Sequence, residues 1–140
     1  MQLLIKKLHK NATLPKFAHV ADAGLDLFTV ADCTILPGQR MQIPVGIALG
    51  IPAGYVGLIW DKSGISQKQG LKTLGGVIDS GYRGEVFVGL YNTGNSACIF
   101  MSGEKIAQLL IQKVEHPEII EVDELDETER GDGAFGSTGV

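Results

Sequence analysis

The chain has 140 residues, 44% of them hydrophobic and 20% charged, which predicts one globular domain with its own core rather than two ordinary domains. The formal net charge of −4 disfavours a binder of duplex nucleic acid, which usually carries a basic face. No apolar run reaches membrane-spanning length, and the opening MQLLIKKLHK is too short for a signal peptide, so we expect no nucleic acid, no membrane and a cytoplasmic protein.

Short apolar or alternating runs between turn residues predict a mostly β chain. The expected strands are residues 3–8, 25–30, 33–36, 41–51, 55–60, 72–78, 85–91, 97–101, 105–114 and 119–122. Only residues 63–70 favour a short helix. This pattern fits a sandwich, a jelly roll or a barrel, and composition does not choose among them.

Two of these strands, 55–60 and 106–111, are apolar on both faces, so each is either central in a sheet or covered by another subunit. Gln108 interrupts the second strand. Because a buried amide needs partners, we expect it to bind a phosphate or to form a hydrogen bond at a subunit interface.

The segment that opens the predicted helix carries Lys62, Ser63 and Gly64. A Ser-Gly pair at the start of a helix presents backbone N–H groups to an anion, and the lysine adds a positive charge. The alternative is a solvated Lys62 beside a Ser63 that caps the helix.

Residues 75–85, GGVIDSGYRGE, predict a hairpin with strands at 77–78 and 85–90. Asp79 and Tyr82 would then stand at its tip. Glycines crowd the same segment, and they either relieve a strained φ/ψ or permit another group, such as a flat ligand, to approach the bare backbone. The alternative is a surface turn whose aspartate caps its own backbone.

The cysteines and histidines indicate neither a disulfide framework nor a transition-metal site. Cys33 and Cys98 follow no CxxC or zinc spacing, and the three histidines are scattered. Buried free thiols are expected.

The end of the chain changes character, from six acidic residues in 121–129 to a glycine-rich segment in 130–139. We therefore divide the chain into a β domain, residues 1–122, and an acidic linker with a C-terminal arm, residues 123–140. Such a tail cannot build a core, and it is either a disordered terminus or a lid.

Five segments in order resemble the motifs of the trimeric dUTPases: ADAGLDL (21–27), DKSGIS (61–66), the 75–85 segment, GEKIAQLLI (103–111) and RGDGAFGSTG (130–139). The resemblance covers nearly the whole chain. It implies an all-β jelly roll, a distorted barrel or sandwich with one short helix and a flexible C-terminal arm. It also implies a homotrimer with shared sites that hydrolyses dUTP at the α-phosphate with Mg²⁺, giving dUMP for dTMP synthesis and pyrophosphate.

The resemblance also implies residue roles. Asp79 would orient and deprotonate the attacking water, since an aspartate is ordinarily ionised at neutral pH. Asp26, which faces opposite to its neighbours Leu25 and Leu27 and is otherwise a solvent-facing strand residue, would bind magnesium through water; Asp22 is a weaker candidate. The phosphates would be bound by Lys62, Ser63, Gly64, Gln108 and Arg130.

The nucleoside would lie against the 75–85 segment. Tyr82 would exclude a ribose 2′-hydroxyl, and backbone groups at Thr73, Gly76 and Val77 would pair with uracil. Phe135 from the arm would stack on the base, and the substrate-binding set also includes Gly136 and Ser137.

Two departures from the family pattern are Lys62, where arginine is usual, and Ala134, where glycine is usual. The rival readings are a dCTP deaminase, alone or bifunctional, and a nucleotide-binding jelly roll without turnover. A dCTP deaminase needs a glutamate as acid and base ten residues after the aspartate that corresponds to Asp79, and this chain has Gly89 at that position.

Overall fold

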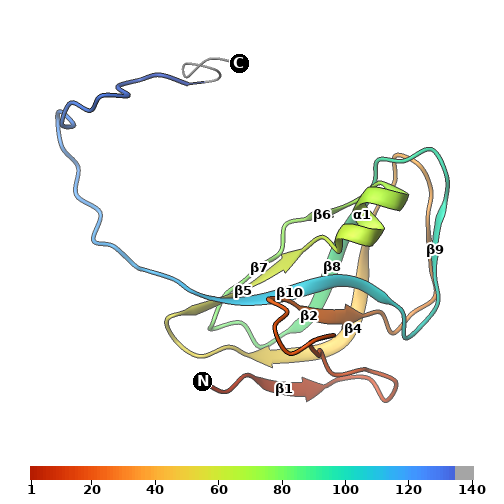
Figure 1. The fold of residues 1–140 in the computed structure, drawn as a ribbon. Coiled ribbons are helices and arrows are strands. Elements are labelled where there is room, and N and C mark those ends of the chain that lie inside the picture. Colours follow the sequence, from red (N-terminus) through yellow and green to blue (C-terminus); the bar gives the residue numbers. More distant parts are fainter. Residues whose placement is uncertain (135–140) are drawn as a thin grey trace.

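The computed structural model describes residues 1–134 and confirms a mostly β chain with one short helix (Figure 1). The elements are β1 (Leu4–Lys7), β2 (Leu25–Phe28), β3 (Cys33–Ile35), β4 (Arg40–Gly50), β5 (Tyr55–Trp60), α1 (Ser63–Gln69), β6 (Leu71–Leu74), β7 (Val77–Ile78), β8 (Glu85–Asn92), β9 (Cys98–Phe100) and β10 (Lys105–Lys113). Within this part of the chain no helix is long and apolar enough to cross a membrane.

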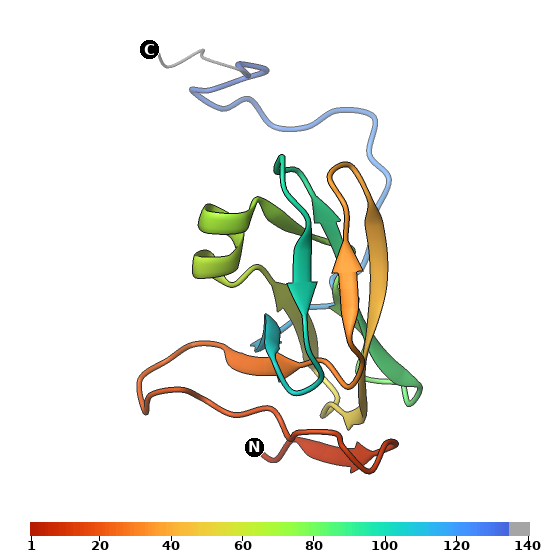
Figure 2. The same ribbon diagram turned by 90° about the vertical axis from the view of Figure 1, so that its right-hand side faces the viewer.

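The strands form open antiparallel sheets. One sheet has the order β1-β4-β8-β6, a second has β2-β10-β5-β7, and β3 pairs with β9. Figures 1 and 2 show the sheets stacked, with α1 at the end of β5. Because neither strand order closes on itself, the architecture is that of a sandwich rather than a closed barrel.

Alternating side chains of β4 and β8 form one wall of the core and those of β2, β5 and β10 the other. The largest buried apolar side chains are Leu27, Ile35, Ile43, Ile47, Leu49, Leu71, Leu90, Ile106 and Leu109. Full burial of such a side chain stabilises the fold by about 1.5–3 kcal/mol. The core therefore holds the strand ends that carry the polar residues described below.

The expected hairpin at residues 77–90 was wrong. β7 pairs with β5, whereas β8 pairs with β4 and β6, so the two strands lie in different sheets. Gly75 and Gly76, which have positive φ of 68° and 104°, turn the chain from β6 in the first sheet to β7 in the second and so interrupt the single strand expected at residues 72–78. A Cβ at Gly76 would lie 2.8 Å from the carbonyl oxygen of Ile59, so this crossing requires glycine.

The positions of β5 and β10 at the centre of their sheet confirm one of the two expectations for these apolar strands. Their outward face is only partly covered in the single chain, where Trp60 is 52% exposed. Cys33 and Cys98 are free, as expected, but only Cys98 is fully buried and Cys33 is half-buried. Burial raises the pKa of both thiols.

The strand expected at residues 119–122 was also wrong. From residue 114 to residue 134 the chain forms neither helix nor strand and runs away from the body (Figure 1). Ile119 is 93% exposed and Ile120 71%, because nothing in the described chain pairs with or covers this apolar run. Pattern alone predicts a strand, but a strand also needs a partner.

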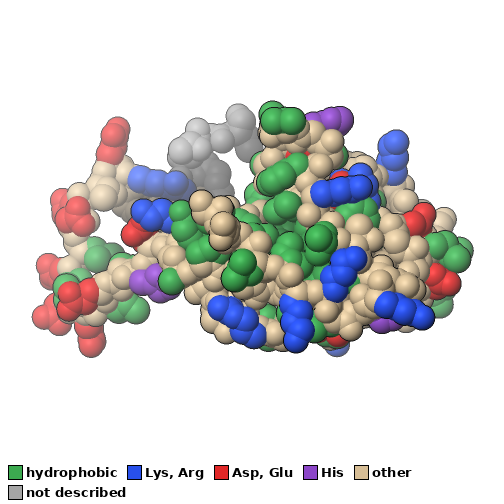
Figure 3. All heavy atoms as spheres, turned by 90° about the horizontal axis from the view of Figure 1, so that it is seen from below, with side chains coloured by type: hydrophobic (Ala, Val, Ile, Leu, Met, Phe, Trp, Pro, Cys, Tyr) green, Lys and Arg blue, Asp and Glu red, His purple; other side chains and the backbone are tan. Residues whose placement is uncertain are grey.

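Charge is divided between the two parts of the molecule. Residues 1–114 hold 11 Lys and Arg against 7 Asp and Glu, a formal charge of +4, whereas residues 115–140 carry −8. Figure 3 shows acidic side chains gathered along the segment that leaves the body, with lysines and arginines spread over the body. The negative net charge therefore belongs to the tail.

Candidate active site

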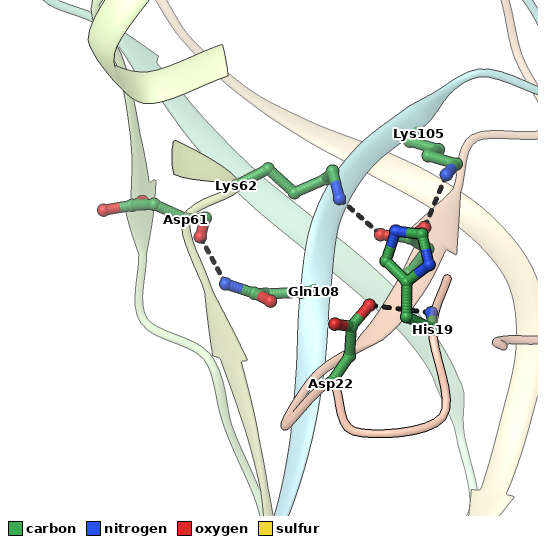
Figure 4. A network of polar contacts seen from close by, with 7 residues as sticks. His19, Asp22, Asp61, Lys62, Lys105 and Gln108 are labelled. Atoms are coloured by element: carbon green, nitrogen blue, oxygen red, sulfur yellow. Dashed lines mark hydrogen bonds and ion pairs between the residues drawn. The ribbon is translucent and has the colours of Figure 1, made fainter. Parts of the chain in front are cut away.

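Asp26 is buried beneath two partly exposed lysines, and we call Asp26, Lys62 and Lys105 the Asp26 cluster. Lys62 Nζ donates to Asp26 Oδ1 at 2.5 Å, and Lys105 Nζ lies 2.7 Å from Oδ2 (Figure 4). Asp26 is 3% exposed, so the solvent-facing alternative was wrong. Strand alternation gives the face of a residue, but it does not show that two lysines cover that face.

The electrostatics of the cluster favour an ionised carboxylate. Burial raises the pKa of Asp26, but the ammonium groups of Lys105 and Lys62 outweigh burial and the net shift is downward. Oδ2 accepts no hydrogen bond of normal geometry from residues 1–134, despite its charge contact with Lys105. The cluster therefore has a net charge of +1 and one carboxylate oxygen able to accept a further hydrogen bond.

Lys105 was not among the site residues predicted from the sequence. Its side chain belongs to β10, the strand that also carries Gln108, and β10 pairs with β2, where Asp26 lies. The available signal was a lysine that begins an otherwise apolar strand within the 103–111 segment. Its partner could not be read from spacing, because the pairing of β2 with β10 joins distant parts of the chain.

The segment before α1 places Lys62 at the N-cap position, with no side-chain cap, and Ser63 and Gly64 at the exposed start of the helix. Ser63 is therefore not the cap that the alternative proposed. Lys62 is not simply solvated either, since it pairs with Asp26.

Gln108 lies opposite both Asp26 and Trp60 in the strand register. Its Nε2 donates to the backbone carbonyl of Asp61 at 2.8 Å, so the amide has a partner inside the chain, where the sequence favoured a phosphate or a subunit interface (Figure 4). A Cβ at Gly24 would collide with the Gln108 amide, so that glycine makes room for it. The Asp22 carboxylate accepts a hydrogen bond from His19 N at 2.9 Å, so it already has a partner in its own turn.

A second group of predicted residues surrounds residues 79–84, which we call the Asp79 turn. Asp79 and Tyr82 line a cavity of about 290 Å³ together with Gly76 and Val77 of the β7 segment. The Asp79 carboxylate is exposed and makes no hydrogen bond or ion pair with any residue from 1 to 134. It does not cap its own turn, so the alternative reading of this segment was wrong.

The Tyr82 ring is held in place while remaining 47% exposed. Its hydroxyl donates to the Glu85 carbonyl at 2.9 Å, and its N–H donates to the Asp79 carbonyl at 3.0 Å. The ring lies against the backbone of Gly84, where any Cβ would collide with it. The turn thus presents a carboxylate and an aromatic ring side by side at the cavity.

Thr73 lies on the other side of β7 and lines a cavity of about 220 Å³ with Trp60, Gly76 and Val77. Its backbone N–H donates to Asp61 Oδ1 at 2.6 Å. This N–H is therefore already engaged, which limits the backbone pairing with a base that the sequence predicted at this position.

Other predicted residues are not brought together within one chain. Within residues 1–134 no hydrogen bond or ion pair joins Asp79 or Tyr82 to Lys62 or Gln108. Arg130 lies on the segment that leaves the body, where its Nε donates to the Gly133 carbonyl at 3.0 Å. The expected contributions of Phe135, Gly136 and Ser137 lie outside the described residues.

The space at Gly89 and the placement of potential metal ligands limit the chemistry of the site. A Cβ at Gly89 would lie 2.8 Å from the Leu74 carbonyl oxygen, so the position at which a deaminase needs glutamate has no room for a side chain. In residues 1–134 no group of three His, Cys, Asp or Glu side chains could hold a metal ion.

Comparison with known proteins decides the family, because residues 10–139 match the dUTPase family model. The chain belongs to the dUTPase family. It is 46% identical to the deoxyuridine 5'-triphosphate nucleotidohydrolase of Mycolicibacterium vanbaalenii, over 98% of this chain and 94% of that protein. It is 45% identical to the enzyme of that name from Clostridium kluyveri, over 100% of this chain and 99% of that protein.

Solved dUTPase structures share the fold. The dUTPase of Staphylococcus bacteriophage 80alpha with dUpNHpp superposes with a TM-score of 0.94 at 32% identity, covering 99% of each chain. A mutant dUTPase from phage phi11 of S. aureus, described as revealing the coordination of a structural Mg(II) ion, has a TM-score of 0.84 at 29% identity and covers 89% of this chain and 98% of that one. The match to the dUTPase family extends through residues 130–139, so the arm segment is part of it.

Proposed function

We propose that this dUTPase-family chain hydrolyses dUTP to dUMP and pyrophosphate by attack of water on the α-phosphorus, which lowers dUTP and supplies dUMP for dTMP synthesis. The observation that carries the proposal is the Asp79 carboxylate, which has no partner among residues 1–134 and lies beside Tyr82 at a cavity lined by Gly76 and Val77. Named relatives at 45–46% identity over nearly the whole chain support the same reaction.

Asp79 acts as the base in this account. Its carboxylate is exposed and makes no hydrogen bond within residues 1–134, so both oxygens are free to accept hydrogen bonds from water. Asp79 orients the water and takes its proton as the new bond to phosphorus forms and the pyrophosphate oxygen leaves. Positioning and charge stabilisation supply most of the catalysis in such reactions.

The Asp26 cluster binds the triphosphate. Lys62 and Lys105 leave a net charge of +1 after pairing with Asp26, and the body as a whole carries a formal charge of +4. Ser63 and Gly64 at the start of α1, the Gln108 amide and Arg130 complete the proposed phosphate contacts. A lysine in place of the usual arginine at position 62 binds phosphate as a point charge rather than as a fork.

Asp26 also fits the proposed role toward Mg²⁺. Its Oδ2 is buried and lies 2.7 Å from Lys105 Nζ, and a carboxylate oxygen with one such neighbour can still accept a hydrogen bond from a metal-bound water. Since residues 1–134 offer no three-ligand protein site, phosphate oxygens and waters would hold most of the ion. Bound magnesium would neutralise phosphate charge and order the triphosphate.

The nucleoside half of the substrate lies at the Asp79 turn. Tyr82 leaves no space for a ribose 2′-hydroxyl, and the backbone near Gly76 and Val77 pairs with the uracil edge. Phe135 stacks on the base from the arm. A backbone donor placed for a uracil oxygen meets the amino group of cytosine instead, and the unpaired groups disfavour that base.

We further propose a homotrimer whose sites are shared between subunits. Arg130 lies far along a segment that leaves the body. Exposed apolar side chains remain on β5, on β7 and along the tail, notably Trp60, Val77 and Ile119. A second copy would cover such surface. In this assembly residues 1–122 form the β domain, residues 123–140 carry the arm that closes over a site, and the protein works in the cytoplasm.

The proposal is tested by measuring pyrophosphate release from dUTP, dCTP, dTTP and UTP with magnesium, with products separated by chromatography. We expect turnover of dUTP to dUMP at least about a hundredfold faster, in kcat/KM, than turnover of the others. Conversion of dCTP to a uracil nucleotide would establish the deaminase reading. Binding of dUTP without turnover would establish a non-catalytic nucleotide-binding protein.

A further inference from the structure

Asp61 joins three strands at the end of β5. Its Oδ1 accepts a hydrogen bond from Thr73 N on β6 at 2.6 Å, and its Oδ2 lies 2.6 Å from Lys72 Nζ. Its backbone carbonyl accepts the hydrogen bond from Gln108 Nε2 on β10 at 2.8 Å. Both carboxylate oxygens and the carbonyl oxygen therefore have partners on other strands.

The Asp61 carboxylate accepts a backbone hydrogen bond at a sheet edge, where no neighbouring strand supplies an acceptor. β6 is the outer strand of its sheet, with β8 on one side only, so backbone N–H groups on its other side need a different acceptor. Asp61 supplies that acceptor to Thr73 as a charge-assisted hydrogen bond. Burial raises the pKa of the Asp61 carboxyl, but the Lys72 ammonium group and the Thr73 contacts outweigh burial and lower it overall.

Asp61 is adjacent to two parts of the candidate site, the Asp26 cluster and the cavity beside β7. Asp61 directly precedes Lys62, which belongs to the Asp26 cluster, and Thr73 lines the cavity beside β7. We propose that Asp61 is a positioning residue that holds the Lys62 segment, Gln108 and Thr73 in fixed relative places without itself contacting substrate. This role rests on the proposed dUTP hydrolysis.

Three variants separate the contacts of Asp61. Asp61→Ala removes both carboxylate contacts, Asp61→Asn keeps an oxygen for Thr73 N while losing the charge, and Lys72→Met removes only the ammonium group. We expect the KM for dUTP to rise about tenfold in Asp61→Ala, about threefold in Asp61→Asn and least in Lys72→Met. The kcat should change less than about threefold in all three, because Asp79 lies on another segment.

A second readout is independent of activity. Hydrogen exchange at the Thr73 amide, measured without nucleotide, should be at least about tenfold faster in Asp61→Ala than in the wild-type protein, and should be partly protected again in Asp61→Asn. Exchange at Val88 in the core serves as the internal reference, because a merely global loss of stability would accelerate both amides together.

Faster exchange at Thr73 with unchanged Val88, together with the ordered rise in KM, supports the inference. Unchanged exchange at Thr73 in Asp61→Ala overturns it whatever the activity, and so does a KM equal to that of the active wild-type protein. A wild-type protein that does not hydrolyse dUTP instead overturns the proposed function, and with it a role of Asp61 in that reaction.

Discussion

The Asp26 cluster and the Asp79 turn differ in how far a single chain completes them. Asp26 is buried and both of its carboxylate oxygens lie beside ammonium groups, whereas Asp79 is exposed and has no partner among the described residues. Tyr82 beside it is half exposed. One region is thus organised before any ligand arrives, and the other presents reactive groups at an open surface.

In the proposed reaction the two regions would have different roles. A prearranged positive cluster binds a polyanion at little cost in ordering, while a carboxylate that must accept a proton from water should not be tied to another donor. Substitutions at the Asp79 turn should therefore change kcat, and substitutions at the Asp26 cluster should change KM.

Asp79→Asn should lower the kcat for dUTP by about a thousandfold, because the amide cannot accept the proton of the attacking water. The affinity for dUTP should remain within about threefold of wild type, since no binding contact is lost. Rapid-quench turnover and equilibrium titration with dUTP measure the two quantities. Asp32→Asn, which alters an aspartate that bonds Ser102 N outside both regions, is the matched control. Wild-type turnover in Asp79→Asn would remove the aspartate from the chemistry.

A chain that ends at Glu129 should lose about a hundredfold in kcat/KM, because the arm no longer excludes water and no longer places Arg130 and Phe135. Its thermal unfolding should match that of the full chain, since Arg130 bonds only within its own segment among the described residues. Activity and unfolding are measured on the same sample. Full activity of the shortened chain would reduce the arm to a passive terminus.

Lys62→Met should raise the KM for dUTP about tenfold and change kcat little, because it removes one cation from the Asp26 cluster and leaves the Asp79 turn intact. Lys62→Arg, the residue usual in the family, should keep a KM near that of wild type and is the control for charge. Steady-state kinetics at fixed magnesium distinguish the variants. A fall in kcat with unchanged KM would place Lys62 in the chemical step.

Low pH should lower the free energy of unfolding, because it protonates aspartates that form ion pairs in the folded protein. The pKa of Asp61 is lowered from its ordinary value of 3.8, so the stability it contributes is present above that value and is lost as the pH falls through the lower folded value. Below about pH 4 the wild-type free energy of unfolding should therefore fall more steeply than that of Asp61→Asn. Urea unfolding between pH 6 and pH 3 measures both slopes, and equal slopes would contradict the ion pair.

Much of the fold could be predicted from the sequence because alternation and turn residues coincide in β4, β5, β8 and β10. The hairpin prediction failed because two adjacent runs suit a hairpin and a crossing between sheets equally well. Only the strand pairing distinguishes them: β7 pairs with β5, whereas β8 pairs with β4 and β6. The strand at 119–122 failed because a run of apolar residues does not supply its own pairing partner.

The site residues also differ in whether a local segment or the pairing of distant strands positions them. Asp79 and Tyr82 could be placed at one cavity from the sequence because a local segment positions both. Lys105 and Asp61 were missed because their contacts depend on which strands become neighbours, and residue spacing does not carry that information. The burial of Asp26 follows from the same pairing.

Mixing two inactive variants tests whether a site is shared between subunits. Asp79→Asn chains are unfolded and refolded together with chains that end at Glu129, in equal amounts. If a site takes Asp79 from one subunit and the arm from another, random assembly restores about a quarter of wild-type dUTP hydrolysis. If the mixture stays as inactive as either parent, although mixed oligomers have formed, each site is contained in one chain. That result would contradict the proposal that subunits share their sites.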